Sequence, residues 1–235
     1  MKRRYRTVAV VVGPDGGVTI ELDGRPMATP GRRPFHVPAR ALAEAIAAEW
    51  LAQGDVVKPD TMPLTQIAAT AIDRVGAQRA ELIPAVAAYG ATDMLCYRAE
   101  EPADLVERQR RLWQPLLDWA ARALDAPLRV TSGILPIDQP ADALAALGRV
   151  VAAYDDFALA ALSCATAASG SLVVGLALMR GEIDAAGAFE AAELDASFQI
   201  ERWGADEEAT HRRAALRQEL ESAARFVGLL YGSQP

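Results

Sequence analysis

The chain has 235 residues, a formal net charge of −7, and a composition that is 51% hydrophobic and 23% charged. This length allows one large domain or two smaller ones, and the composition excludes a disordered chain. The acidic balance argues against a general nucleic-acid-binding protein, which would present a basic face. Two cysteines, Cys96 and Cys164, are too few for a disulfide scaffold or a cysteine-rich metal site, so we expect buried thiols.

The N-terminal segment is predicted to form a small antiparallel sheet with a covering helix. Residues 5–12 and 17–22 are rich in strand-forming residues, and the GPDGG sequence between them is typical of a hairpin turn. Residues 35–37 end a proline-rich stretch and are predicted to form a short edge strand. A helix is expected over residues 39–53, with Gly54 as the glycine that follows its C-terminus.

The rest of the chain has a mainly helical pattern, and we place a domain boundary near residue 60. This division gives a small N-terminal α/β domain, residues 1–60, and a helical C-terminal domain, residues 61–235. Pro63 suits the first position of a helix that runs to Val75. Further helices are predicted over residues 77–89, 102–125, 140–153, 184–203 and 206–230.

Two short apolar segments interrupt the helical pattern. They are residues 92–98, with the sequence TDMLCYR, and residues 128–133, with the sequence LRVTSG. Each is too short for a helix of typical length and contains strand-forming residues. We expect both to be extended and to pair with each other.

The stretch from Asp155 to Arg180 organises the predicted helical domain. It has no charged residue between Asp156 and Arg180, so it is long enough to cross a bilayer. Its many small residues and its lack of an aromatic belt favour a buried central helix that ends at Gly181 over a membrane span. The predicted fold class is therefore α+β: a small N-terminal antiparallel sheet with a covering helix, followed by a larger all-helical domain packed round a central apolar helix.

Motifs that carry chemistry are absent from the sequence. There is no GxxxxGK[ST] loop, no GxGxxG after a predicted strand, and no GxSxG sequence. The two histidines, His36 and His211, have no cysteine or second histidine near them in the sequence, which argues against a zinc site. We therefore assign no catalytic, cofactor-binding or metal-ligating residue.

Carboxylates gather round Trp203 near the C-terminus. One interpretation is an acidic recognition patch with an aromatic anchor, suited to a partner that presents arginine. Another is that the acids in the first turn of the last helix stabilise it, because their negative charge interacts favourably with the positive end of the helix macrodipole. Paired acid/base catalysis is a third, and an enzyme of unknown class that uses this cluster is the alternative function. The candidate residues are Asp195, Glu201, Trp203, Asp206, Glu207 and Glu208.

A few charged residues also stand in apolar surroundings. Asp73 and Arg74 are adjacent within a predicted apolar helix, and Asp93 lies near Arg98 in the TDMLCYR segment. Buried charged groups need partners, so we expect these residues to form internal ion pairs or helix caps.

Seven segments, spread in order along nearly the whole chain, carry a family resemblance. They are LDGRPMATPG (22–31), ALAEAIAAEWLAQG (41–54), DTMPLTQIAATAID (60–73), YGATDMLCYRAEEP (89–102), RQRRLWQPLLDWA (108–120), SGSLVVGLAL (169–178) and LDASFQIERWGADEEA (194–209). Any one segment is a weak signal, whereas the ordered set is specific. Together they resemble one protein family, the assembly chaperones of the ATP synthase F(1) sector that act on the alpha subunit in mitochondria and alphaproteobacteria.

The resemblance implies a small α/β domain before a helical domain, with no catalytic activity and no cofactor. It implies an ATP-independent chaperone that binds the free alpha subunit and shields the surface later covered by the beta subunit. We expect a monomer when the chaperone is free, with no nucleic-acid partner and no insertion into the membrane. The lack of a transit peptide suggests a bacterial, cytoplasmic member or a trimmed mature form, whereas eukaryotic relatives would act in the mitochondrial matrix.

The resemblance also implies a role for an acid in the segment that begins with Trp203. The matching acids are Asp206 and Glu208, with Glu207 between them. The sequence departs from the family pattern earlier in this segment, where an acid usually follows the Leu-Asp pair. Here Ala196 follows, so that Asp195 is the only acid of its turn.

Overall fold

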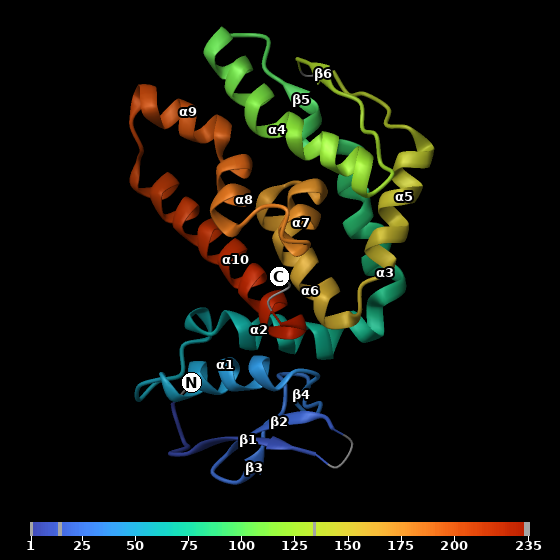
Figure 1. Cartoon of the computed structure of the whole chain (residues 1–235). Helices are drawn as coiled ribbons and strands as arrows, with labels where there is room; N and C mark the ends of the chain where they lie inside the picture. The colour runs from blue at the N-terminus through green and yellow to red at the C-terminus, as the bar shows by residue number, and fades with distance from the viewer. Residues whose placement is uncertain (1, 14–15, 134, 233–235) are drawn as a thin grey trace. The chain divides into compact units, whose positions relative to one another are not determined.

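The computed structural model describes residues 2–13, 16–133 and 135–232 (Figure 1). The chain forms two compact units, each assembled from more than one stretch of sequence, and the division between them falls inside three helices. The first unit continues past residue 60. That residues 1–60 and 61–235 fold as independent domains stays a prediction. The first unit comprises Met1–Arg79, Asp155–Ala161 and Ser222–Pro235, and the second comprises Ala80–Tyr154 and Leu162–Glu221.

The first unit contains a small antiparallel sheet built on the predicted hairpin. Strands β1 and β2 pair in a register that places Val10 opposite Ile20, and the turn between them includes residues 14 and 15, which lie outside the described residues. The predicted strand at residues 35–37 is confirmed as a two-residue strand that pairs with β2. The strands are β1 (Val8–Val12), β2 (Val18–Leu22), β3 (Arg25–Pro26) and β4 (His36–Val37).

Helix α1 (Arg40–Leu51) covers this sheet, as the sequence predicted (Figure 1). Leu42 and Ile46, one helical turn apart, are fully buried and provide its apolar face. The prediction for Gly54 was wrong. The helix ends earlier, at Leu51, and its capping residue Ala52 keeps a right-handed φ of −70°, so no left-handed glycine is needed there.

The next helical segment begins at Pro63, the first residue of α2 (Pro63–Thr70). Proline is favoured at this position because its missing N–H would have no partner within the helix. A π-helical turn (Ala71–Val75) then joins α2 to α3 (Gly76–Ala87). The turn contains Asp73, whose carboxylate accepts hydrogen bonds from Thr29 Oγ1 (2.6 Å) and Gly31 N (2.8 Å). This contact joins the loop after β3 to the helical segment.

The second unit is mainly helical. The two predicted extended segments do pair, through the short parallel strands β5 (Tyr97–Arg98) and β6 (Thr131–Ser132), although Met94–Cys96 form a 3-10 turn instead of a strand. The longer elements are α4 (Ala103–Ala123), α5 (Ala141–Ala152), α6 (Asp156–Ser169), α7 (Leu172–Met179), α8 (Ala185–Ala192), α9 (Leu194–Trp203) and α10 (Glu207–Tyr231), of which α6 begins and α10 ends in the first unit.

The prediction of one continuous central helix was wrong. The apolar stretch is divided into α6 and α7 at Gly170, which has a left-handed φ of 70°. Ser171 then starts α7 by accepting a hydrogen bond from Val174 N through its hydroxyl (3.0 Å). Every residue of α7 is buried, as expected for a helix that is apolar on all sides. Among the residues described, no helix is both long enough and apolar enough to cross a membrane.

Asp93 supports this break from a distant part of the chain. Its fully buried carboxylate accepts hydrogen bonds from Ser171 Oγ (2.7 Å), Val173 N (3.0 Å) and Leu95 N (3.2 Å). It thereby satisfies backbone donors at the start of two helical turns. The expectation that Asp93 acts as a cap is confirmed, whereas Arg98 donates to backbone carbonyls, including Gln109 O at 2.8 Å.

The predicted helix over residues 184–203 is also divided in two, at Glu193. This residue lies between α8 and α9 with a φ of −109°, and its side chain is only 4% exposed. Its carboxylate forms ion pairs with two arginines of α10. Oε2 lies 2.6 Å from Arg213 Nη1, and Oε1 lies 3.1 Å from Arg212 Nη1. The division thus places a buried acid where the last helix can supply positive charge.

Candidate functional site

The candidate residues round Trp203 lie on the consecutive helices α9 and α10 and, for Asp206, in the short connection between them (Figure 1). Gly204 ends α9 with a left-handed φ of 83°, a conformation that glycine adopts without strain. Asp206 then starts α10, because its Oδ1 accepts a hydrogen bond from Ala209 N (2.6 Å). The predicted helix end at residue 203 is confirmed.

The end of this helical pair exposes one large aromatic side chain. Trp203 is 76% exposed, the largest value among the exposed large hydrophobic residues of the described part of the chain. Glu207 and Glu208 follow in the first turn of α10 and are also exposed. We call Trp203, Asp206, Glu207 and Glu208 the hairpin tip, which combines an aromatic surface with negative charge.

Ion pairs with α4 hold α9 in place. Arg108 Nη1 lies 2.8 Å from Glu201 Oε2, and Arg202 Nη2 lies 2.7 Å from Asp104 Oδ2. The Arg202 guanidinium also lies over the ring of Phe198, at 4.0 Å from its centroid. All four charged groups are roughly half exposed, so each pair contributes well under ~1 kcal/mol to stability. Their main effect is to orient α9.

Asp195 has a structural role at the other end of α9. Its Oδ1 accepts a hydrogen bond from Nε2 of Gln109, a buried residue of α4, at 2.8 Å. The carbonyl oxygen Oε1 of the same Gln109 side chain accepts a hydrogen bond from Ala99 N at 2.8 Å. Asp195 is therefore occupied within the second unit, and the structure does not bring it to the hairpin tip.

The other four acids of the cluster divide into three kinds. Asp206 caps a helix, as the interpretation based on helix ends expected, and Glu201 is paired with Arg108. Glu207 and Glu208 extend into solvent, and Nε2 of the exposed His211 lies 3.8 Å from Oε1 of Glu207. Two exposed carboxylates beside an exposed tryptophan remain as groups that a partner could contact.

The acids of the cluster do not line the cavity beside the hairpin tip. The volume of this cavity is about 490 Å³, and its lining includes Ile200, Ala205 and Thr210. In the part of the chain that the structure describes, no group of three or more histidine, cysteine or acidic side chains is arranged to hold a metal ion. The geometry suits contact with a large partner better than acid/base catalysis.

Sequence reasoning missed Glu193 and its arginines. Glu193 carries no local signal of burial, because it stands among alanines in a predicted helix. The arginine pair at 212 and 213 lies 19 and 20 residues further along the chain. Only the packing of α8 and α10 brings these charges together.

Comparison with solved structures places the whole fold in a known class. Atp12 from Paracoccus denitrificans is 42% identical and matches with a TM-score of 0.92, over 97% of this chain and 98% of that one. An Asp-to-Lys mutant of the same protein gives the same TM-score and identity. The Atu1473 protein from Agrobacterium tumefaciens, described as a chaperone, is 39% identical with a TM-score of 0.93, over 97% of this chain and 86% of that one.

Comparison of sequences narrows the class to a family. The family model described as ATP12 chaperone protein matches residues 2–121. Protein atp12, mitochondrial, from Schizosaccharomyces pombe is 26% identical over 207 residues, which is 83% of this chain and 71% of the yeast protein. The chain therefore belongs to the ATP12 chaperone family, the chaperones of ATP synthase assembly that the seven segments indicated.

Proposed function

We propose that this chaperone binds the free alpha subunit of the ATP synthase F(1) sector and shields the surface that the beta subunit later covers. The observation that carries the proposal is the hairpin tip, where Trp203 is 76% exposed next to the exposed carboxylates of Glu207 and Glu208. The resemblance described above supplies the identity of the partner. The relatives named as chaperones support the general role.

The chemistry of the tip suits a partner surface with an apolar centre and basic groups nearby. Tryptophan is enriched among the residues that dominate binding energies, because it buries a large area with little loss of side-chain freedom. Carboxylates beside it can form charge-assisted hydrogen bonds with arginine, which strengthen as the partner excludes water. Glu207 and Glu208 are available for this because both project from the first turn of α10.

Release would follow from competition with the beta subunit. A chaperone that contacts only part of the alpha surface forms a moderate interface, so the larger permanent contact displaces it. The sequence contains no nucleotide-binding motif, and we propose that holding and release need no ATP hydrolysis. We further propose that the chaperone acts in the bacterial cytoplasm, as a monomer when free and with no nucleic-acid partner.

The test is co-purification of the chaperone with the alpha subunit of the same organism, with beta as the control. We expect alpha to be retained, beta alone not to be retained, and alpha to be released when beta is added. Trp203→Ser should reduce the retained alpha at least tenfold. Leu51→Ser is the matched control, because Leu51 is also the last residue of a helix and is 51% exposed.

Two results would count against the proposal. If the wild-type chaperone does not retain free alpha, the partner is wrong. If Trp203→Ser and Leu51→Ser both retain alpha as the wild type does, the partner is right and the hairpin tip is not the contact. Circular dichroism of each variant separates these results from a loss of folding.

A further inference from the structure

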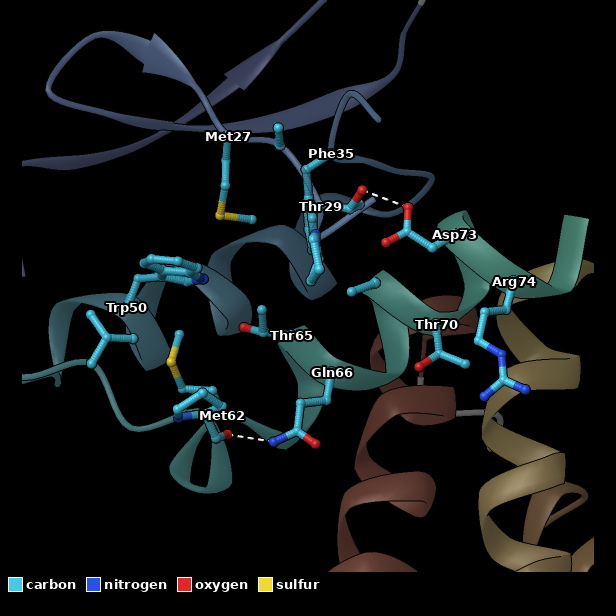
Figure 2. A pocket seen from close by; sticks show the side chains of 15 residues that line it. Met27, Thr29, Phe35, Trp50, Met62, Thr65, Gln66, Thr70, Asp73 and Arg74 are labelled. Atoms are coloured by element: carbon cyan, nitrogen blue, oxygen red, sulfur yellow. Dashed lines mark hydrogen bonds between the residues drawn. The ribbon is translucent and has the colours of Figure 1, made fainter. Parts of the chain in front are cut away.

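The first unit contains a pocket to which the function proposed above assigns no role (Figure 2). Its volume is about 710 Å³, within the range of about 300–1,000 Å³ that ligand sites occupy. Its walls come from the loop after β3, from α1, and from α2 with the π-helical turn. Two of the family-like segments, LDGRPMATPG and DTMPLTQIAATAID, therefore face each other across it.

Most of the pocket wall is apolar. Met27, Phe35 and Met62 are almost fully buried beneath its surface, and Figure 2 shows the sulfur-containing side chains of Met27 and Met62 on either side of Trp50. Methionine adapts to differently shaped ligands because its side chain is flexible and its sulfur is polarisable. Ala69 contributes a small side chain from α2, which leaves the space beside it open. The pocket is suited to bulky apolar groups.

The two charged side chains of the lining have opposite signs, so the lining carries no net charge, and the carboxylate is engaged in hydrogen bonds. Asp73 accepts hydrogen bonds from Thr29 and Gly31, so its carboxylate holds the loop in place (Figure 2). Arg74 is exposed and lies next to it in the lining, and these two side chains are the only charged ones in the lining as described. A pocket without net charge favours a neutral occupant, because a charged one would lose hydration without a compensating partner.

One donor in the pocket is buried and unpaired. Nε1 of Trp50 is shielded from solvent and has no hydrogen-bond partner among the residues that the structure describes. The ring of Trp50 is held by Tyr5, at a centroid distance of 5.5 Å, and Tyr5 Oη donates a hydrogen bond to Trp50 O (2.7 Å). An unpaired buried N–H is rare, because it costs free energy that an acceptor would recover.

We propose that this pocket binds an apolar, uncharged segment of the unassembled alpha subunit, and that the Trp50 ring turns on binding so that its shielded Nε1 donates a hydrogen bond to a backbone carbonyl of that segment. The inference rests on the function proposed above and adds a second contact to it. A polypeptide fits the chemistry because every residue carries a carbonyl acceptor beside a side chain. Segments that a subunit interface later buries are apolar and uncharged at their centre, as the lining requires.

The test places a tryptophan side chain in the pocket and compares this variant with one that carries the same substitution outside the pocket. Ala69→Trp places a large side chain in the open space. Ala48→Trp is the matched control, because Ala48 is an exposed alanine of α1 that does not line the pocket. Trp50→Phe removes the N–H donor and keeps an aromatic ring against Tyr5. The probes are overlapping 15-residue peptides that cover the alpha sequence, together with the free alpha subunit.

We expect one or a few uncharged, apolar peptides to bind the wild-type chaperone and Ala48→Trp equally. Ala69→Trp should weaken their binding at least tenfold and reduce protection of free alpha against aggregation. Trp50→Phe should weaken peptide binding about fivefold, the effect of one hydrogen bond. Thermal denaturation should give similar midpoints for the three variants and the wild type.

The outcomes separate the two proposals. If wild-type and Ala69→Trp chaperones retain alpha and bind peptides equally, the pocket proposal is overturned and the hairpin tip stands. If no peptide binds the wild type, but an uncharged apolar dye such as Nile red binds the wild type and fails to bind Ala69→Trp, the pocket takes a small molecule and the proposal is also overturned. If the wild type fails to retain alpha, the proposed function itself is wrong.

Discussion

At the scale of single residues, the polar group that most needs hydrogen-bond partners is the fully buried carboxyl of Asp93. Burial raises the pKa of its carboxyl above the usual 3.8, while hydrogen bonds from Val173 N, Ser171 and Leu95 N act in the opposite direction. The carboxyl is tolerated because three donors converge on it. It therefore links the 3-10 turn after residue 93 to the start of α7.

Removing this carboxyl should destabilise the protein strongly. Asp93→Ala leaves buried donors without acceptors, and we expect a loss of about 3 kcal/mol in the free energy of unfolding, measured by urea denaturation. Asp93→Asn keeps one acceptor oxygen and should lose less. Equal stability of the alanine variant and the wild type would show that water replaces the carboxylate and that the contact is not required.

The raised pKa of Asp93 also predicts a pH dependence. The folded state holds the proton more tightly than the unfolded state, so this group favours folding most below pH 3.8. Its contribution falls as the pH rises from the unfolded pKa to the raised folded pKa. The difference in unfolding free energy between wild type and Asp93→Asn should therefore shift against the wild type from pH 4 to pH 7. A difference that moves the other way would mean that the carboxylate is preferentially ionised in the folded state.

Glu208 tests the electrostatic part of the hairpin tip. Glu208→Lys should leave the unfolding midpoint nearly unchanged, because an exposed charge reversal in a first helical turn costs ~1 kcal/mol or less. It should clearly weaken the protection of free alpha against aggregation, measured by light scattering. Glu182→Lys, another exposed reversal in the second unit, is the control. Unfolding of Glu208→Lys would show that the residue is structural.

At the scale of elements, the packing of α7 against α6 depends on a glycine. A Cβ atom on Gly175 would lie 2.6 Å from Thr166 Oγ1 and 3.3 Å from Leu162 Cδ1. The side chains of α6 therefore approach the backbone of α7 directly. The break at Gly170 makes this possible, because a continuous helix could not fold back on itself.

Alanine at this position should be destabilising. We expect Gly175→Ala to cost about 1–3 kcal/mol through overlap with Thr166, despite the higher helix propensity of alanine. Gly148→Ala is the matched control, because its Cβ would meet nothing within 4 Å in α5, and it should gain up to about 1 kcal/mol. Thermal denaturation of both variants measures the opposite shifts. A stabilised Gly175→Ala would mean that α7 can move away from α6 at little cost.

At the scale of the whole molecule, the net charge of −7 favours separation of free copies. We expect sedimentation equilibrium to give a single species of 25.0 kDa without the alpha subunit. Raising the salt concentration, which screens repulsion between like charges, should leave this mass unchanged. A stable species of twice the mass would contradict a monomer and would call for a test of whether the dimer covers the hairpin tip.

Local sequence signals were enough to predict several elements and the family. Hairpin chemistry predicted β1 and β2, proline predicted the start of α2, and the seven ordered segments predicted the family. It also placed Trp203 and its acids near a helix boundary at Gly204. These features depend on residues that are neighbours in the chain, whose conformational preferences act locally.

Tertiary structure alone decided the rest. An apolar stretch without periodicity gives no signal of where it breaks, and the break at Gly170 is completed by Asp93, 78 residues before Ser171. The same holds for the split at Glu193, which needs arginines from α10, and for the pocket, whose walls come from separate segments. Such choices depend on burial and hydrogen bonding between residues far apart in the chain, and packing fixes them only when the whole core forms.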